Sequence, residues 1–150
     1  MILAQKIAED LKTTIKLKDE LRLNCLRILK TAVKNRQIEK GSDLKDEEVQ
    51  SVISSLIKKG IEASMEFRKA GRGDLADKED REIKILYEYL PEQLSHDEIE
   101  KILLETIKEL SAESQKDLGK VMKIAMARMS GKVQGREVND IARRLLSNPA

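Results

Sequence analysis

Residues 86–98, with the sequence LYEYLPEQLSHDE, separate two helical halves of this 150-residue chain. Pro91 disfavours helical backbone at the residue before it and therefore predicts that a helix ends by Leu90. Ser95 and Glu98 have the spacing of a capping box, in which two side chains bond the free backbone N–H groups of a helix start. The stretch thus predicts a helix end, a short linker and a new helix, with a domain boundary at Pro91.

Apolar residues recur with helical spacing on both sides of this linker. Upstream, Val49, Ile53 and Gly60 belong to one stripe, and downstream Val121 and Ala125 belong to another. We expect seven helices, at about residues 2–17, 19–40, 46–70, 74–90, 95–110, 115–129 and 137–147. The predicted fold class is all-α, with an N-terminal helical bundle over residues 1–91 and a small C-terminal three-helix domain over residues 92–150.

The composition narrows the class of protein further. Aromatic residues make up only 2% of the chain, which disfavours a β-sandwich or β-barrel. The single cysteine, Cys25, and the single histidine, His96, exclude an intrachain disulfide, a multi-cysteine or multi-histidine metal site and an iron–sulfur cluster. The chain has no apolar run of membrane-spanning length, and its charged start lacks the apolar core of a signal peptide. We therefore expect a cytoplasmic protein with no membrane association, no metal and no cofactor.

No sequence pattern predicts a self-contained active site. The chain lacks both the GxxxxGK[ST] and the GxGxxG phosphate-binding motifs. His96 falls in the first turn of an expected helix, without recognisable partners for a catalytic triad. Cys25 lies on an apolar helix face and is interpreted as a buried small hydrophobic residue. Glu79, Asp80 and Glu82 are interpreted as a solvated helix face, the alternative being a carboxylate pair for acid–base chemistry. We therefore predict no catalytic residue.

Charge is segregated along the chain. Residues 1–40 carry ten basic and five acidic residues, residues 41–113 carry eleven and nineteen, and residues 114–150 carry eight and three. Basic ends that flank an acidic middle favour an anionic partner. The alternative is that the basic ends are solvated or pack near the acidic middle of the same chain.

The basic residues of the last segment are the best-organised candidates for contacting phosphates. Three lysines recur at i, i+4 and i+7 opposite the apolar face of the expected sixth helix, and the others follow in the next loop and on the polar side of the last helix. The candidate nucleic-acid-binding residues are Lys116, Lys120, Lys123, Lys132, Arg136, Arg143 and Arg144. No aromatic residue accompanies them to stack on bases, which favours a structured RNA held by its backbone.

Gly119 lies inside the expected sixth helix, where glycine costs about 1 kcal/mol relative to alanine. This cost predicts a close approach at Gly119. A second helix is the simpler interpretation, and an RNA backbone is the other.

Several short motifs together resemble the GatB/YqeY family, and specifically a stand-alone YqeY-like protein. They are LRILK at 26–30, EEV at 47–49, ADKE at 76–79, YLPEQLS at 89–95, DLGKVMK at 117–123 and the pair Gly135-Arg136. The resemblance implies a small cytosolic bacterial protein with an N-terminal helical domain and a C-terminal three-helix domain. That domain is similar to the tail of the B subunit of the glutamine-dependent tRNA amidotransferase, which binds the outside of the tRNA.

The resemblance also implies tRNA contact at the glycine-containing helix, with Lys120 and Lys123 as the best candidates. It carries a family-level link to carbon–nitrogen ligase activity with glutamine as amide donor, although these residues include neither the kinase-like domain nor the glutaminase of that enzyme. The predicted function is a tRNA-binding accessory protein. The alternative is a helical adaptor that docks onto another cytosolic protein and does not bind nucleic acid, and a third possibility is a ligase that acts within a complex.

Overall fold

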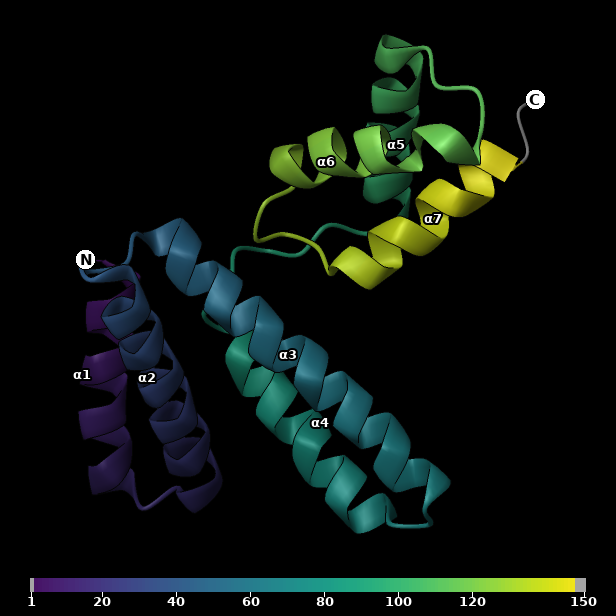
Figure 1. Cartoon of the computed structure of the whole chain (residues 1–150). Helices are drawn as coiled ribbons and strands as arrows, with labels where there is room; N and C mark the ends of the chain where they lie inside the picture. The colour runs from purple at the N-terminus through teal and green to yellow at the C-terminus, as the bar shows by residue number, and fades with distance from the viewer. Residues whose placement is uncertain (1, 148–150) are drawn as a thin grey trace. The chain divides into compact units, whose positions relative to one another are not determined.

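The computed structural model describes residues 2–147. Over this range the chain has seven α-helices, one short 3-10 helix and no strand, so the prediction of an all-α fold is confirmed (Figure 1). The helices are α1 Leu3–Leu17, α2 Glu20–Lys40, α3 Asp46–Lys69, α4 Gly73–Tyr87, α5 His96–Leu110, the 3-10 helix η1 Gln115–Asp117, α6 Leu118–Arg128 and α7 Gly135–Ser147. They form two compact units, one ending at Pro91 and the other beginning at Glu92. The last three residues of the expected C-terminal domain lie outside the described range.

The N-terminal unit consists of the helical hairpins α1–α2 and α3–α4 around one apolar core. Leu26, Leu29 and Ile53 are fully buried in it. The Asp19 carboxylate caps α2 by accepting the Arg22 backbone N–H at 3.1 Å. The same helix ends at Gly41, whose φ of +80° is the left-handed conformation that glycine adopts most readily. These local signals fix the length of α2 and so the start of the next hairpin.

Gly60 lies at the close contact of α3 with α4. A Cβ atom at this position would lie 3.0 Å from Cγ1 of Ile83, so any larger residue would force the Ile83 side chain to shift. Two polar contacts extend the same seam. The Ser64 hydroxyl donates to the Asp80 carboxylate at 2.7 Å, and the Arg68 guanidinium donates to it at 2.6 Å. Asp80 therefore belongs to the helix contact, which corrects its interpretation as part of a solvated face.

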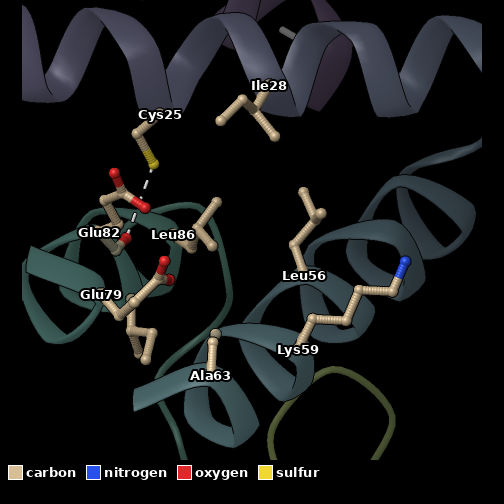
Figure 2. A pocket seen from close by; sticks show the side chains of 10 residues that line it. Cys25, Ile28, Leu56, Lys59, Ala63, Glu79, Glu82 and Leu86 are labelled. Carbon is tan, nitrogen blue, oxygen red and sulfur yellow. Dashed lines mark hydrogen bonds between the residues drawn. The ribbon is translucent and has the colours of Figure 1, made fainter. Parts of the chain in front are cut away.

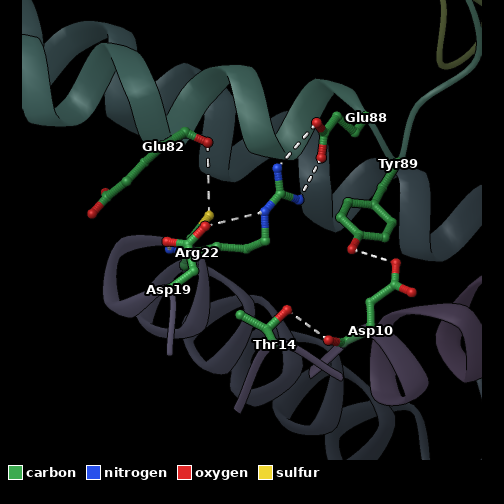
Figure 3. A network of polar contacts seen from close by, with 8 residues as sticks. Asp10, Thr14, Asp19, Arg22, Glu82, Glu88 and Tyr89 are labelled. Carbon is green, nitrogen blue, oxygen red and sulfur yellow. Dashed lines mark hydrogen bonds and ion pairs between the residues drawn. The ribbon is translucent and has the colours of Figure 1, made fainter. Parts of the chain in front are cut away.

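The end of α4 differs from the prediction, because the helix stops at Tyr87 rather than near residue 90. Residues 88–90 instead make consecutive i to i+3 turns that bring Tyr89 and Leu90 into the core. Figure 3 shows how the turns are held: the Tyr89 hydroxyl donates to the Asp10 carboxylate at 2.6 Å, and Arg22 donates to both Glu88 carboxylate oxygens, at 2.6 and 3.2 Å. Burial and the bond to Asp10 raise the pKa of Tyr89 above its ordinary value. Tyr89 of the YLPEQLS motif thus ties the linker to α1, and Glu88, just before the motif, ties it to α2.

Two smaller differences concern the start of α4 and the exposure of apolar residues on α1 and α2. Asp74, where the sequence predicts the fourth helix to begin, lies inside the first turn of α4 and pairs with Arg72 at 3.1 Å. Ile15 and Ile28 are apolar residues within the helical pattern, yet they are 52% and 55% exposed. The buried stripe of each helix is therefore narrower than its run of apolar residues.

We predict that Gly60→Val lowers the free energy of unfolding by about 1–3 kcal/mol, because the added atoms overlap Ile83. Gly119→Val is the matched control, since a Cβ there meets no atom within 4 Å and valine favours helix over glycine. Thermal and urea unfolding followed by circular dichroism measure both. Equal effects of the two substitutions would show that the α3–α4 contact tolerates a side chain.

The domain boundary at Pro91 is tested by limited proteolysis with a protease that cleaves after glutamate. Glu92 is exposed and lies outside the helices. Two other exposed glutamates outside the helices are held in place: Glu88 pairs with Arg22, and the Glu113 backbone N–H donates to Asp117. The glutamates of α3, α5 and α7 lie in hydrogen-bonded helix. We expect the first cut after Glu92, giving two fragments that resist further digestion. A first cut inside a helix, with residues 88–96 intact, would contradict the boundary.

Candidate nucleic-acid interface

The core of the C-terminal unit decides which side chains of α6 and α7 reach solvent. Val121 and Ala125 form the buried stripe of α6, Met129 continues it just after the helix, and Val138 and Ile141 begin that of α7. Both helices pack against α5, and Figure 1 shows the three helices together. The predicted capping box at the start of α5 is confirmed: Ser95 and Glu98 each accept the other's backbone N–H at 3.2 Å. With these apolar stripes inside, the basic residues between them face outward.

The predicted helix over residues 115–129 is wrong at its start. Residues 115–117 form η1, and α6 begins at Leu118. The Ser114 hydroxyl accepts the Lys116 backbone N–H, and the Gln115 amide donates to the Arg143 carbonyl at 2.8 Å and to the Ser147 hydroxyl at 2.6 Å. These contacts hold the 3-10 turn against the end of α7. Lys116 therefore sits on η1 beside that end, and not on the same helix as Lys120 and Lys123.

All seven basic candidates are exposed. Arg144 pairs with Glu100 at 3.3 Å, and the Arg143 guanidinium donates to the Asn139 side chain at 2.8 Å. The other five make no ion pair within residues 2–147; they are Lys116, Lys120, Lys123, Lys132 and Arg136. We call these five residues the free cations. They keep their full charge available for an external anion.

The free cations do not converge on one point. Lys116 precedes α6 and Lys132 follows it, and the eleven residues of that helix rise about 16 Å. The loop that carries Lys132 is held in place because its carbonyl accepts the Leu94 N–H at 2.8 Å and because the Gln93 amide donates to the Gly131 carbonyl at 2.9 Å. A set of charges spread over this length matches successive phosphates of a nucleic-acid backbone rather than a single anion.

Acidic groups lie among these cations too: Glu137 follows Arg136 on α7, and Asp117 lies just before α6. The Asp117 carboxylate accepts the Glu113 backbone N–H at 3.0 Å. That bond, with a smaller contribution from the charge of Lys120, holds the pKa of Asp117 below its ordinary value. Asp117 is therefore anionic at neutral pH and offsets part of the positive charge at the start of α6.

Gly119 corrects the simpler interpretation of the sequence. A Cβ atom here would meet no atom within 4 Å, so no helix of the described chain approaches it. It also lies in the first turn of α6 rather than in the helix interior. Gly119 is therefore an exposed stretch of backbone beside Lys120.

Cys25 and His96, the residues considered for catalysis, lie in a buried and a surface environment, respectively. Cys25 is buried, its thiol donates to the Glu82 carbonyl at 3.7 Å, and burial raises its pKa to about 12. It is therefore protonated at neutral pH, as expected of a buried small hydrophobic residue. His96 lies on the surface, 3.9 Å from Glu100, whose carboxylate also pairs with Arg144.

Residues 2–147 present neither a cluster of metal ligands nor a membrane-spanning helix. No group of three or more His, Cys, Asp or Glu side chains there could hold a metal ion. No helix in this range is both long and apolar enough to cross a bilayer.

Two contacts of this unit have no counterpart among the predicted residues. Arg128 belongs to the basic segment, yet its guanidinium donates to the Thr106 hydroxyl at 3.1 Å and pairs with Glu109. It joins α6 to α5 and is not a free cation. The other is Gln115, whose side chain positions η1. Neither contact has a signal in a single sequence, because both join residues that are 19 or more positions apart.

The chain matches a family model described as "Yqey-like protein" over residues 4–146. Relatives with the name "Altered inheritance of mitochondria protein 41, mitochondrial" occur in several yeasts. The Lachancea thermotolerans protein is 35% identical over 85 residues, which are 56% of this chain and 46% of that protein. The Kluyveromyces lactis protein is 37% identical over 84 residues, or 55% and 45% of the two chains. A Saccharomyces cerevisiae protein is 29% identical over 119 residues, or 75% and 64%. The first two matches span about half the length of these relatives, and the names refer to mitochondria without stating an activity.

Proposed function

Because the chain belongs to the YqeY-like family, we propose that it is a tRNA-binding accessory protein whose C-terminal unit contacts the phosphate backbone of the folded RNA. The observation that carries the proposal is that the five free cations are exposed and spread over η1, α6, the following loop and the first turn of α7. A cation without a protein partner can bind phosphate without first breaking an ion pair, and each such contact releases counterions from the nucleic acid. The resemblance of DLGKVMK to the amidotransferase tail supports the same surface.

Lys120 and Lys123 are the centre of the proposed surface. They lie one turn apart on the exposed side of α6, opposite the buried Val121 and Ala125. Lysine is a compact charge on a flexible stem, so it follows a backbone whose phosphate spacing varies. The unit has no tyrosine, phenylalanine or tryptophan that could stack on an unpaired base. The proposal is therefore recognition of RNA shape and backbone rather than of base sequence.

Gly119 is the proposed point of closest approach. It exposes backbone without a side chain at the start of α6, and Lys120 follows it directly. A phosphate or ribose can approach a glycine more closely than any other residue. This interpretation gives the glycine an external contact in place of the helix contact that the sequence suggested.

The role that fits this surface is to hold tRNA for a reaction performed elsewhere. The family-level link to carbon–nitrogen ligase activity with glutamine as donor then refers to the fate of the bound tRNA and not to chemistry on this chain. We propose a cytoplasmic protein of bacterial type, as the resemblance implies. The yeast relatives carry mitochondrial names.

We predict that replacing Lys116, Lys120 and Lys123 with glutamate weakens the binding of bulk tRNA by about tenfold to a hundredfold at 100 mM salt. The substitution removes three attracting charges and adds three repelling ones on an exposed surface. Thermal stability should change little, because exposed charges contribute little to folding. Fluorescence anisotropy with labelled tRNA measures the first effect, and circular dichroism measures the second.

A matched control changes the net charge of the chain by the same amount, with all three substitutions in the N-terminal unit. Lys12, Lys16 and Lys58 are exposed and make no ion pair within the described residues. Replacing these three with glutamate should weaken tRNA binding by less than about threefold, through net charge alone. If the two triple variants bind equally, the α6 surface is merely solvated, and the adaptor alternative moves ahead.

We also expect the purified chain to hydrolyse neither ATP nor glutamine and to leave mischarged tRNA unchanged. The sequence has no nucleotide-binding loop, and the Cys25 thiol is buried and protonated. Coupled phosphate-release and glutaminase assays test this. Turnover that a single substitution in this chain abolishes would contradict the accessory role and support the ligase alternative.

A further inference from the structure

A groove in the N-terminal unit has no role in the proposed tRNA binding. It lies between α2, α3 and α4 and encloses about 250 Å³ (Figure 2). Its apolar walls include Ile28 from α2, Leu56 and Ala63 from α3 and Leu86 from α4. Ile28 is 55% exposed, although it is a large aliphatic residue that borders an apolar space. The two helical hairpins therefore leave an apolar channel open to solvent between them.

Two carboxylates line one side of the groove. Glu79 and Glu82 lie one turn apart on α4, both half-buried, and neither forms an ion pair within residues 2–147. Burial, together with the negative charge of Glu79, raises the pKa of Glu82 above its ordinary value. In Figure 2 the Lys59 ammonium points away from these carboxylates, at the other end of the groove. A cation placed between Glu79 and Glu82 would relieve their mutual repulsion and compensate for their burial.

We propose that this groove binds an amphipathic helix of a partner protein. The apolar residues of that helix fill the space between Ile28 and Leu56, and a lysine or arginine beside its apolar face pairs with Glu79 and Glu82. The volume supports side chains of a helix as the occupant, because pockets for drug-sized molecules begin near 300 Å³. Walls formed by three helices present the kind of groove in which an amphipathic helix packs. The unpaired carboxylates supply the charge complementarity that selects a basic helix.

This proposal is independent of tRNA binding, because the groove and the free cations belong to different units. It places a protein partner on the N-terminal unit while the C-terminal unit remains available for RNA. A substitution in the groove should leave the tRNA affinity unchanged within about twofold, since it changes none of the phosphate-contacting residues. Each proposal can thus fail while the other holds.

The test uses the full chain and a display library of 16-residue helices. Leucine is fixed at positions i, i+3, i+4 and i+7 of each helix, and the flanking positions vary freely among lysine, glutamine and glutamate. We expect selected peptides to carry lysine beside the apolar stripe. Fluorescence anisotropy then measures a labelled selected peptide against the parent chain and its variants. A library that yields no binder, or that enriches glutamate at the flanks, would overturn the proposal.

Two isoleucines of α2 provide a matched pair of variants. Ile28 borders the groove, whereas Ile38 does not and is 70% exposed. We expect Ile28→Lys to weaken peptide binding at least about tenfold and Ile38→Lys to change it less than about twofold. Both variants should fold, because both side chains already face solvent, and circular dichroism checks this. Equal effects of the two substitutions would show that the peptide binds elsewhere.

A double variant tests the pairing of the partner's cation with Glu79 and Glu82. Replacing Glu79 and Glu82 with glutamine keeps the shape of the groove and removes the negative charge. We expect a loss of about fivefold for the lysine-bearing peptide and less than about twofold for the same peptide with glutamine in place of lysine. Equal losses for the two peptides would refute the pairing of the partner's cation with these carboxylates.

Discussion

The burial of Val121 and Ala125 on one side of α6, and of Met129 just after the helix, is the constraint on which the proposed RNA surface depends. All three side chains are fully buried, and they repeat every four residues. With this stripe packed into the core, Lys120 and Lys123 can only face solvent. The chain thus uses the free energy of an apolar core to hold like charges side by side on its surface. Coulomb repulsion between exposed lysines is small in water, so this arrangement lowers the free energy of unfolding only slightly. The charges remain available to bind an anion.

Much of the fold follows from signals that act over a few residues. Gly41 ends α2 because its backbone is left-handed, and Ser95 starts α5 because its hydroxyl satisfies a free N–H group. Both act locally, so one sequence suffices to predict them. The same holds for the outward direction of Lys120 and Lys123, which follows from helical periodicity alone.

Features that join distant segments could not be predicted in this way. The helix α4 ends three residues early because Tyr89 reaches Asp10, 79 positions away in the chain. Lys116 leaves α6 because Gln115 bonds to the far end of α7, and Ile28 is exposed because the two hairpins leave a groove between them. The pattern of one helix does not reveal which neighbour covers it. Gly119 shows the same limit, since its cost in a helix suggested a neighbouring helix that is not there.

The salt dependence of tRNA binding by the parent chain tests the central claim most directly. Anisotropy with labelled bulk tRNA between about 50 and 200 mM sodium chloride gives the slope of the logarithm of the association constant against the logarithm of the salt concentration. If each of the five free cations contacts one phosphate, we predict a linear decrease with a slope between about −3.5 and −4.5. No measurable binding, or a slope near zero, would contradict a surface that holds RNA by its backbone.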